Sequence, residues 1–264
     1  MPPIFSVTSD QLSVWMVAFL WPFVRIMALI STAPVFSESA VPRTAKIGLA
    51  ALLSMVIAPT LGALPSVPLV SAGGLWILIQ QLLIGAAMGF SMRMVFALVQ
   101  VAGDYAGLQM GLSFATFFDP TSGGSTMVLA RLLNVLAILI FLATNGHLTL
   151  ILTLAESFRT LPLADAPLAA SGWFLLASAG GQIISDGLML ALPLVATLLT
   201  LNLAMGILNR ASPQFSIFAV GFPVTLLAGM AMLQLSMQYL APFLQPRFAA
   251  GFTSLLQFLH ALHP

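Results

Sequence analysis

Long apolar runs separated by short polar stretches dominate the chain. A run of about 18 or more mostly apolar residues is long enough to form a membrane-spanning helix. About six such segments are visible, at residues 12–33, 47–64, 75–102, 127–154, 188–208 and 215–244. The pattern predicts an all-α, polytopic protein built from apolar helical hairpins. We expect some of these segments to be broken rather than simple spans.

The third segment has one face of small and polar residues. At spacings of four residues this face contains Gln81, Gly85, Gly89, Arg93 and Ala97, and Gln100 and Asp104 follow it. Small residues at this spacing let two helix backbones approach closely. The face is therefore expected either to pack within the chain or to meet another subunit or a conduit. Contact with lipid is disfavoured, because an arginine at membrane depth costs roughly 3 kcal/mol or more.

Arg25 lies well inside the first apolar segment. A cation in that position either extends its head to the membrane interface or pairs with an acid. Asp104 and Asp186 are the candidate partners, and the sequence leaves the choice open.

Polar residues also interrupt the later segments. Asn202 and Arg210 share one face of the fifth segment with Gly206, and Arg131 lies near the start of the fourth. We expect Asn202 to form a hydrogen bond between helices, worth on the order of 1 kcal/mol. The run Asn145-Gly146-His147 predicts a turn or kink inside the fourth segment.

The connection at residues 103–124 is long, apolar and rich in aromatic residues. Glycines recur at 103, 107 and 111, aromatic residues follow, and Asp119-Pro120 and Thr121 to Gly124 are strong turn formers. Three readings remain open for this connection. It is an ordinary core loop, or a re-entrant loop that closes a pore, or it carries Ser113 as the nucleophile of an intramembrane protease with His147 as its base.

Composition narrows the class of protein. Of 264 residues, 6% are charged and 60% are hydrophobic, and there is no cysteine. So few charges exclude an isolated soluble enzyme and a disordered chain. Because there is no cysteine, disulfides and thiolate metal sites are excluded. The Lys and Arg residues are scattered and do not indicate nucleic-acid binding. Apart from the Ser113 reading, no catalytic, cofactor or metal motif is present. The first ten residues lack the basic start of a cleaved signal, so we expect the first apolar segment to be retained.

Five segments have specific sequences, and several of them are long: FVRIMALISTAPVFSESAVPRTAKIGLA (23–50), QQLLIGAAMGF (80–90), GLQMGLSFATFFDP (107–120), NGHL (145–148) and LLTLNLAMGILNRASPQFSIFAVGFP (198–223). Together they resemble the FliR family of the bacterial flagellar type III secretion export gate. Nearly the whole chain is covered. One departure is Asp104, where the family usually has Glu, so a salt bridge there would differ in reach.

The resemblance implies a single domain, 1–264, within a heteromeric ring. Residues 1–187 would match FliP and contain the plug loop 107–124, and residues 188–246 would match the FliQ hairpin. The implied partners are several FliP and FliQ subunits around one copy of this chain, FlhB, FlhA, unfolded flagellar export substrates and membrane lipid. The implied location is the flagellar basal body in the bacterial inner membrane, partly raised toward the periplasm.

The resemblance also assigns roles to residues. The plug or gating residues would be Gly107, Met110, Gly111, Leu112, Phe114, Phe117, Phe118, Asp119 and Pro120. The contacts between helices or subunits are expected at Arg25, Gln81, Gly85, Gly89, Arg93, Asp104, Arg131, Asn202 and Arg210. The expected function is non-enzymatic: to form and plug a protein-conducting channel. The alternative is a small-molecule or ion transporter with a re-entrant loop.

Overall fold

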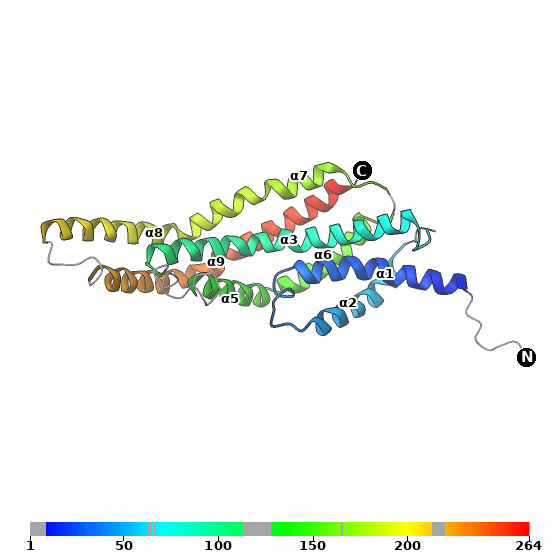
Figure 1. Ribbon diagram of the computed structural model, residues 1–264, viewed down its shortest axis with the longest axis horizontal. Coiled ribbons are helices and arrows are strands. Elements are labelled where there is room, and N and C mark those ends of the chain that lie inside the picture. The colour runs from blue at the N-terminus through cyan, green and yellow to red at the C-terminus, as the bar shows by residue number, and fades with distance from the viewer. Residues whose placement is uncertain are drawn as a thin grey trace, which may run out of the picture. The chain divides into compact units, whose positions relative to one another are not determined.

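The computed structural model describes residues 9–62, 65, 67–112, 128–164, 166–212 and 220–263, and it contains helices and no strand over these ranges. The helices are α1 (Ser9–Thr32), α2 (Arg43–Ile57), the short 3-10 helix η1 (Ala58–Thr60), α3 (Ala72–Gln109), α5 (Val128–Ala143), α6 (Gly146–Thr160), α7 (Ala170–Ser178), α8 (Gly180–Ala211) and α9 (Phe222–Leu262) (Figure 1). The predicted all-α class is confirmed.

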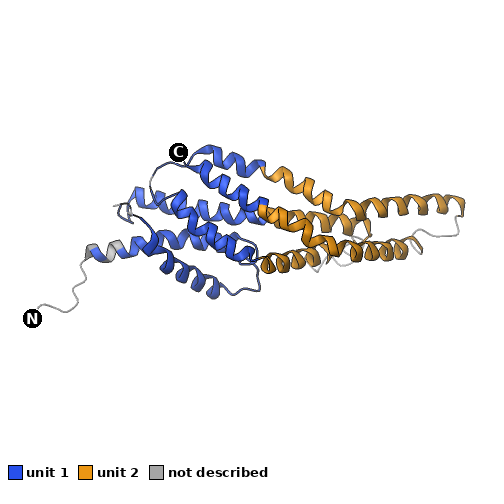
Figure 2. Cartoon of the chain, turned by 180° about the vertical axis from the view of Figure 1, so that it is seen from behind, with its two compact units in different colours: residues 1–93, 145–178, 250–264 blue, residues 94–144, 179–249 orange. Residues whose placement is uncertain are grey.

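The chain forms two compact units. Unit 1 contains residues 1–93, 145–178 and 250–264, and unit 2 contains residues 94–144 and 179–249 (Figure 2). Two long helices, α3 and α9, supply residues to both units. This division differs from the expected boundary near residue 188, which concerns likeness to two other proteins and stays a prediction.

Close approach of α1 and α3 organises unit 1. A Cβ atom at Gly85 would overlap the carbonyl oxygen of Arg25, and one at Gly89 would overlap the hydroxyl of Thr32. Only glycine fits at these two positions, because atoms of α1 occupy the space that a side chain would need. In the same unit, α2 packs against α1, and the Ser54 hydroxyl donates a hydrogen bond of 2.9 Å to the Phe19 carbonyl.

The end of α9 is held in unit 1 by α7. The N–H of Ala169 donates to the Leu262 carbonyl at 3.0 Å, and the Ser171 hydroxyl donates to the Ala261 carbonyl at 2.8 Å. Trp173 meets Phe258 edge to face, with 5.7 Å between ring centroids. These bonds satisfy carbonyls in the last turn of α9, which have no partner within the helix.

Unit 2 has a core of three phenylalanines from three helices. Phe96 of α3, Phe141 of α5 and Phe248 of α9 lie with their ring centroids 5.2–5.4 Å apart. Two glycines bring further helix pairs together: Gly103 of α3 lies against Ala130 of α5, and Gly187 of α8 lies against α3. Aromatic contact and close backbone packing thus combine in this unit.

Most helix boundaries differ from the expected segments. The helix α3 starts at residue 72 and continues to 109, so it includes Gly103 and Gly107, which were expected in a loop. The segment expected at 47–64 is a helix of only 15 residues, and Pro59 in η1 follows its end. The fourth segment is broken as predicted, because Asn145 adopts a left-handed conformation with φ 57° between α5 and α6.

Several helices are long and apolar enough to cross a membrane. Four candidate spans lie at Trp15–Thr32, Ala72–Gln109, Ala170–Ala211 and Phe222–Leu262, and α5 with α6 gives a fifth if a broken pair counts as one span. A polytopic architecture is therefore confirmed for the described part of the chain, although the sequence alone indicated about six segments.

The contact between α1 and α3 predicts a large effect of a side chain at Gly85. We expect Gly85→Leu to lower the free energy of unfolding by more than the ~1–3 kcal/mol typical of overpacking, because the obstructing atom belongs to the backbone. Gly48→Leu is the matched control, since a Cβ there meets no atom within 4 Å. Unfolding of both variants in detergent micelles measures the difference, and equal stability would contradict the close approach.

Candidate functional site

The most constrained polar cluster surrounds Arg25 in unit 1. Its guanidinium is 0% exposed. Nε donates to Gln81 Oε1 at 2.7 Å, and one terminal nitrogen donates to the carbonyl and the hydroxyl of Ser157 at 2.9 and 3.1 Å. The other terminal nitrogen donates to the Leu161 carbonyl at 2.9 Å. The ring of Phe158 lies 4.3 Å from the guanidinium carbon. One side chain thus joins α1, α3 and the end of α6.

Among the described residues, the partners of the Arg25 charge are dipoles and not an acid. The carbonyls of Ser157 and Leu161 lie at the C-terminal end of α6, where the helix dipole is negative and favours a cation. We expected Arg25 either to pair with an acid or to extend to the membrane interface. The structure shows a third arrangement, in which helix-end carbonyls and Gln81 are its partners. Asp186, one of the two candidate acids, instead lies 3.8 Å from Arg247 of α9, whose guanidinium also covers the ring of Phe243 at 4.0 Å.

The small and polar face of α3 divides into two parts. Gln81, Gly85 and Gly89 are buried, and the two glycines contact α1. By contrast, Arg93 is exposed, and Asp104 is half-buried. The first part of the face thus packs within the chain. The second part leaves a cation on the surface of an apolar helix.

The remaining predicted contact residues also lie on the surface. Arg131 of α5 and Asn202 and Arg210 of α8 are exposed. Over the described residues, no group of three or more His, Asp or Glu side chains is placed to hold a metal ion.

The helix α3 ends where the expected plug segment begins. The N–H of Leu112 donates to the Gly107 carbonyl at 3.0 Å, and the N–H of Gly111 donates to the Leu108 carbonyl at 3.1 Å. Gly111 has φ 77°. This is the Schellman arrangement that closes many helices, with glycine at its left-handed position. Gly107 is therefore helical, and Gly111 terminates α3.

Met110 is buried at this helix end. It is 1% exposed, and a Cβ at Gly229 of α9 would lie only 2.5–2.8 Å from three of its side-chain atoms. Met110 thus fills the space that the missing side chain of Gly229 leaves. The other expected plug residues, Phe114, Phe117, Phe118, Asp119 and Pro120, lie outside the described residues, as does Ser113 of the protease reading.

Sequence reasoning missed three features of this site. The carbonyl acceptors of Arg25 carry no sequence signal, because every residue has a carbonyl. The pairing of Met110 with Gly229 joins positions that are distant in the chain. The end of α3 did have a signal, since a glycine just after an apolar helix indicates a helix C-terminus.

Comparison with known proteins identifies the family. Residues 16–251 match the model of a family described as bacterial export proteins, family 1. The chain belongs to this family. It is 52% identical over 248 residues to the flagellar biosynthetic protein FliR of Pectobacterium carotovorum, with 94% of this chain and 95% of that protein covered. It is 49% identical to FliR of Escherichia coli, with 97% and 98% covered, and 30% identical to FliR of Bacillus subtilis, with 82% and 84% covered. This FliR-type chain thus matches flagellar relatives over nearly all of its length.

The Arg25 cluster predicts that its charge stabilises the fold. Arg25→Met leaves Gln81 Oε1 and the Leu161 carbonyl without the donor that Arg25 supplies, while the Ser157 carbonyl keeps the Leu161 N–H at 2.9 Å. Each buried unpaired group costs about 1–3 kcal/mol. We expect a loss of ~3–5 kcal/mol in the free energy of unfolding, and a smaller loss for Arg25→Lys, because an ammonium group lacks the planar fork of Arg. Arg43→Met, at an exposed arginine of α2, is the control. Equal unfolding free energies for Arg25→Met and Arg43→Met would refute the role of the cluster.

The contact between Met110 and Gly229 predicts a change in methionine oxidation. In the unmodified chain, peroxide should oxidise Met110 slowly and the exposed Met230 quickly, because oxidation follows exposure. Gly229→Leu should displace Met110 and raise its oxidation several-fold without changing that of Met230, as read by mass spectrometry. Gly206→Leu is the control, since a Cβ at Gly206 meets no atom within 4 Å. Unchanged protection of Met110 in Gly229→Leu would show that the two residues are not coupled.

Proposed function

We propose that this chain is a subunit of a heteromeric export gate in the flagellar type III secretion apparatus, where it helps to form and plug a protein-conducting channel. The family description and the flagellar relatives support a role in flagellar biosynthesis and export. The gate role is the more specific step, and it depends on the surface of α8 and on the end of α3.

The exposed surface of α8 carries the proposal. In an 18-residue window of the candidate span Ala170–Ala211 only 17% of the residues are buried, although the mean hydropathy of the window is 2.1. Large apolar side chains such as Leu203 and Ile207 lie exposed on the same helix as exposed Asn202 and Arg210. Exposure of the apolar side chains to water is unfavourable, and so is exposure of the amide and the guanidinium to lipid. Other protein subunits satisfy both.

The partners follow from the FliR resemblance. FliP and FliQ subunits would cover this surface in a hetero-oligomer with one copy of this chain, while FlhB and FlhA would associate with the assembled gate. Unfolded flagellar proteins would be the substrates. The assembly would lie in the bacterial inner membrane at the basal body, and apolar helices of spanning length support a membrane location.

The end of α3 supports the plugging step. A conduit for a single helix needs a diameter of about 10–12 Å, and a hole of that size would leak ions without a seal. The segment that starts at Leu112 is apolar and aromatic, and it leaves α3 directly after Met110, which is held against α9. A fixed base of this kind would give the proposed seal a defined starting point.

Deletion of residues 112–118 tests both parts of the proposal. In the assembled complex the deletion should raise ion conductance, because it removes Phe114, Phe117 and Phe118, while co-purification with two other apolar proteins is retained. Replacing the three phenylalanines with leucine is the control, since an apolar seal remains. Conductance is measured in planar bilayers.

Two outcomes would contradict the proposal. Unchanged conductance after the deletion would refute the plug. A chain that purifies alone as a stable monomer or homo-oligomer would refute the gate subunit and favour the transporter alternative.

A further inference from the structure

A groove in unit 1 takes no part in the proposed gate. It encloses about 710 Å³ between the end of α2, η1 and α6. This volume lies within the ~300–1,000 Å³ typical of ligand sites. Its walls are mainly apolar and include Val56, Ile57, Leu152, Phe158 and Leu163. Phe158 also stacks with Arg25, so one wall of the groove belongs to the Arg25 cluster.

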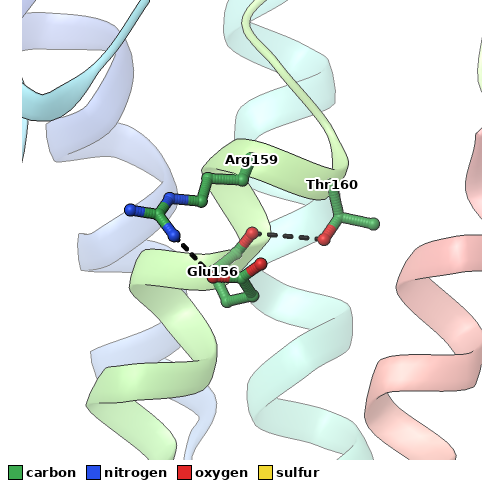
Figure 3. Close-up of polar contacts among 3 residues, drawn as sticks. All are labelled: Glu156, Arg159 and Thr160. Carbon is green, nitrogen blue, oxygen red and sulfur yellow. Dashed lines mark hydrogen bonds and ion pairs between the residues drawn. The ribbon is translucent and has the colours of Figure 1, made fainter.

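The lip of the groove carries one acid and one base. Glu156 Oε2 and Arg159 Nη1 lie 3.6 Å apart on α6, and their side chains are 53% and 81% exposed. Figure 3 shows the two groups pointing toward each other, while the Thr160 hydroxyl donates to the Glu156 carbonyl at 3.2 Å. The lip therefore presents a pair of opposite charges with no net charge.

The two helices that line the groove also carry exposed apolar side chains. Leu52 and Met55 of α2 and Leu148 and Leu152 of α6 are all at least 49% exposed. An occupant that matches this surface has an apolar part for the groove and two opposite charges for the lip. A zwitterionic phospholipid has both, whereas an anionic lipid has no partner for Glu156.

We propose that this groove binds an acyl chain of an ethanolamine phospholipid, with the phosphate at Arg159 and the ammonium at Glu156. The guanidinium donates paired hydrogen bonds to phosphate oxygens, and the ammonium donates N–H groups to the carboxylate. A choline headgroup has no N–H to donate, so it fits less well. This proposal does not depend on the gate role.

Photo-crosslinking in the purified full chain, together with whatever subunits co-purify, tests the site. The probe is phosphatidylethanolamine with a diazirine in its acyl chain, and mass spectrometry locates the labelled peptides. Labelling should concentrate on α2 and α6 around the groove and exceed that near Leu199 and Leu203, exposed apolar residues of α8. Leu152→Trp should fill the groove and abolish the labelling, whereas Leu203→Trp should not change it.

Charge variants give the sharper test. Arg159→Glu leaves two carboxylates at the lip, and it should weaken labelling about tenfold, which corresponds to ~1.4 kcal/mol. Glu156→Lys leaves two cations and should shift the preference toward phosphatidylglycerol. The double exchange Glu156→Arg with Arg159→Glu restores the neutral pair and should restore labelling by the ethanolamine probe. Both side chains are more than half exposed, so folding should be retained, as equal melting temperatures would verify.

Three results would overturn the proposal. The first is equal labelling of the groove and of α8. The second is Arg159→Glu with undiminished labelling. The third is a photoreactive amino acid at residue 152 that crosslinks to another protein chain instead of lipid, which would assign the groove to a subunit interface.

Discussion

The buried guanidinium of Arg25 is the constraint on which the packing of unit 1 depends. A cation that is 0% exposed needs polar partners on every side, and it finds them in Gln81 and in carbonyls at the end of α6. Those bonds form only when α1, α3 and α6 lie close together. The requirement extends to Gly85, one helical turn from Gln81, where any side chain would meet the Arg25 carbonyl. The burial of the Arg25 charge and the absence of a side chain at Gly85 therefore depend on the same close packing of α1 and α3.

Sequence patterns predicted the elements better than their partners. Apolar runs identified most of the long helices, the Gln81-Gly85-Gly89 spacing indicated close packing, and Asn145-Gly146 marked a break that the structure contains. The environment of Arg25 was not predictable, because half of its acceptors are backbone carbonyls, which every residue possesses. Gly111 was expected among the plug or gating residues, and its hydrogen bonds and φ of 77° show that it also ends α3.

The hydropathy of a helix does not show whether protein or lipid covers its apolar surface. Within the candidate spans Ala72–Gln109 and Ala170–Ala211, windows of 18 residues have mean hydropathies of 1.9 and 2.1, yet 56% of the first window and 17% of the second are buried. Their sequences look alike because protein interior and lipid both select apolar residues. The positions of the polar groups distinguish the two helices, and the exposed Asn202 and Arg210 of α8 support the proposed contact with other subunits.

The glycines extend this reasoning from the chain to its assembly. Gly85, Gly103 and Gly187 each lie against a neighbouring helix of their own unit, and a Cβ at each would collide with it. The same residue type at Gly206 of α8 meets no atom within 4 Å, although glycine in a helix interior costs about 1 kcal/mol relative to alanine. Within the chain that cost is offset wherever two backbones approach. At Gly206 no such contact is present among the described residues, and in the proposed gate a helix of another subunit would supply it.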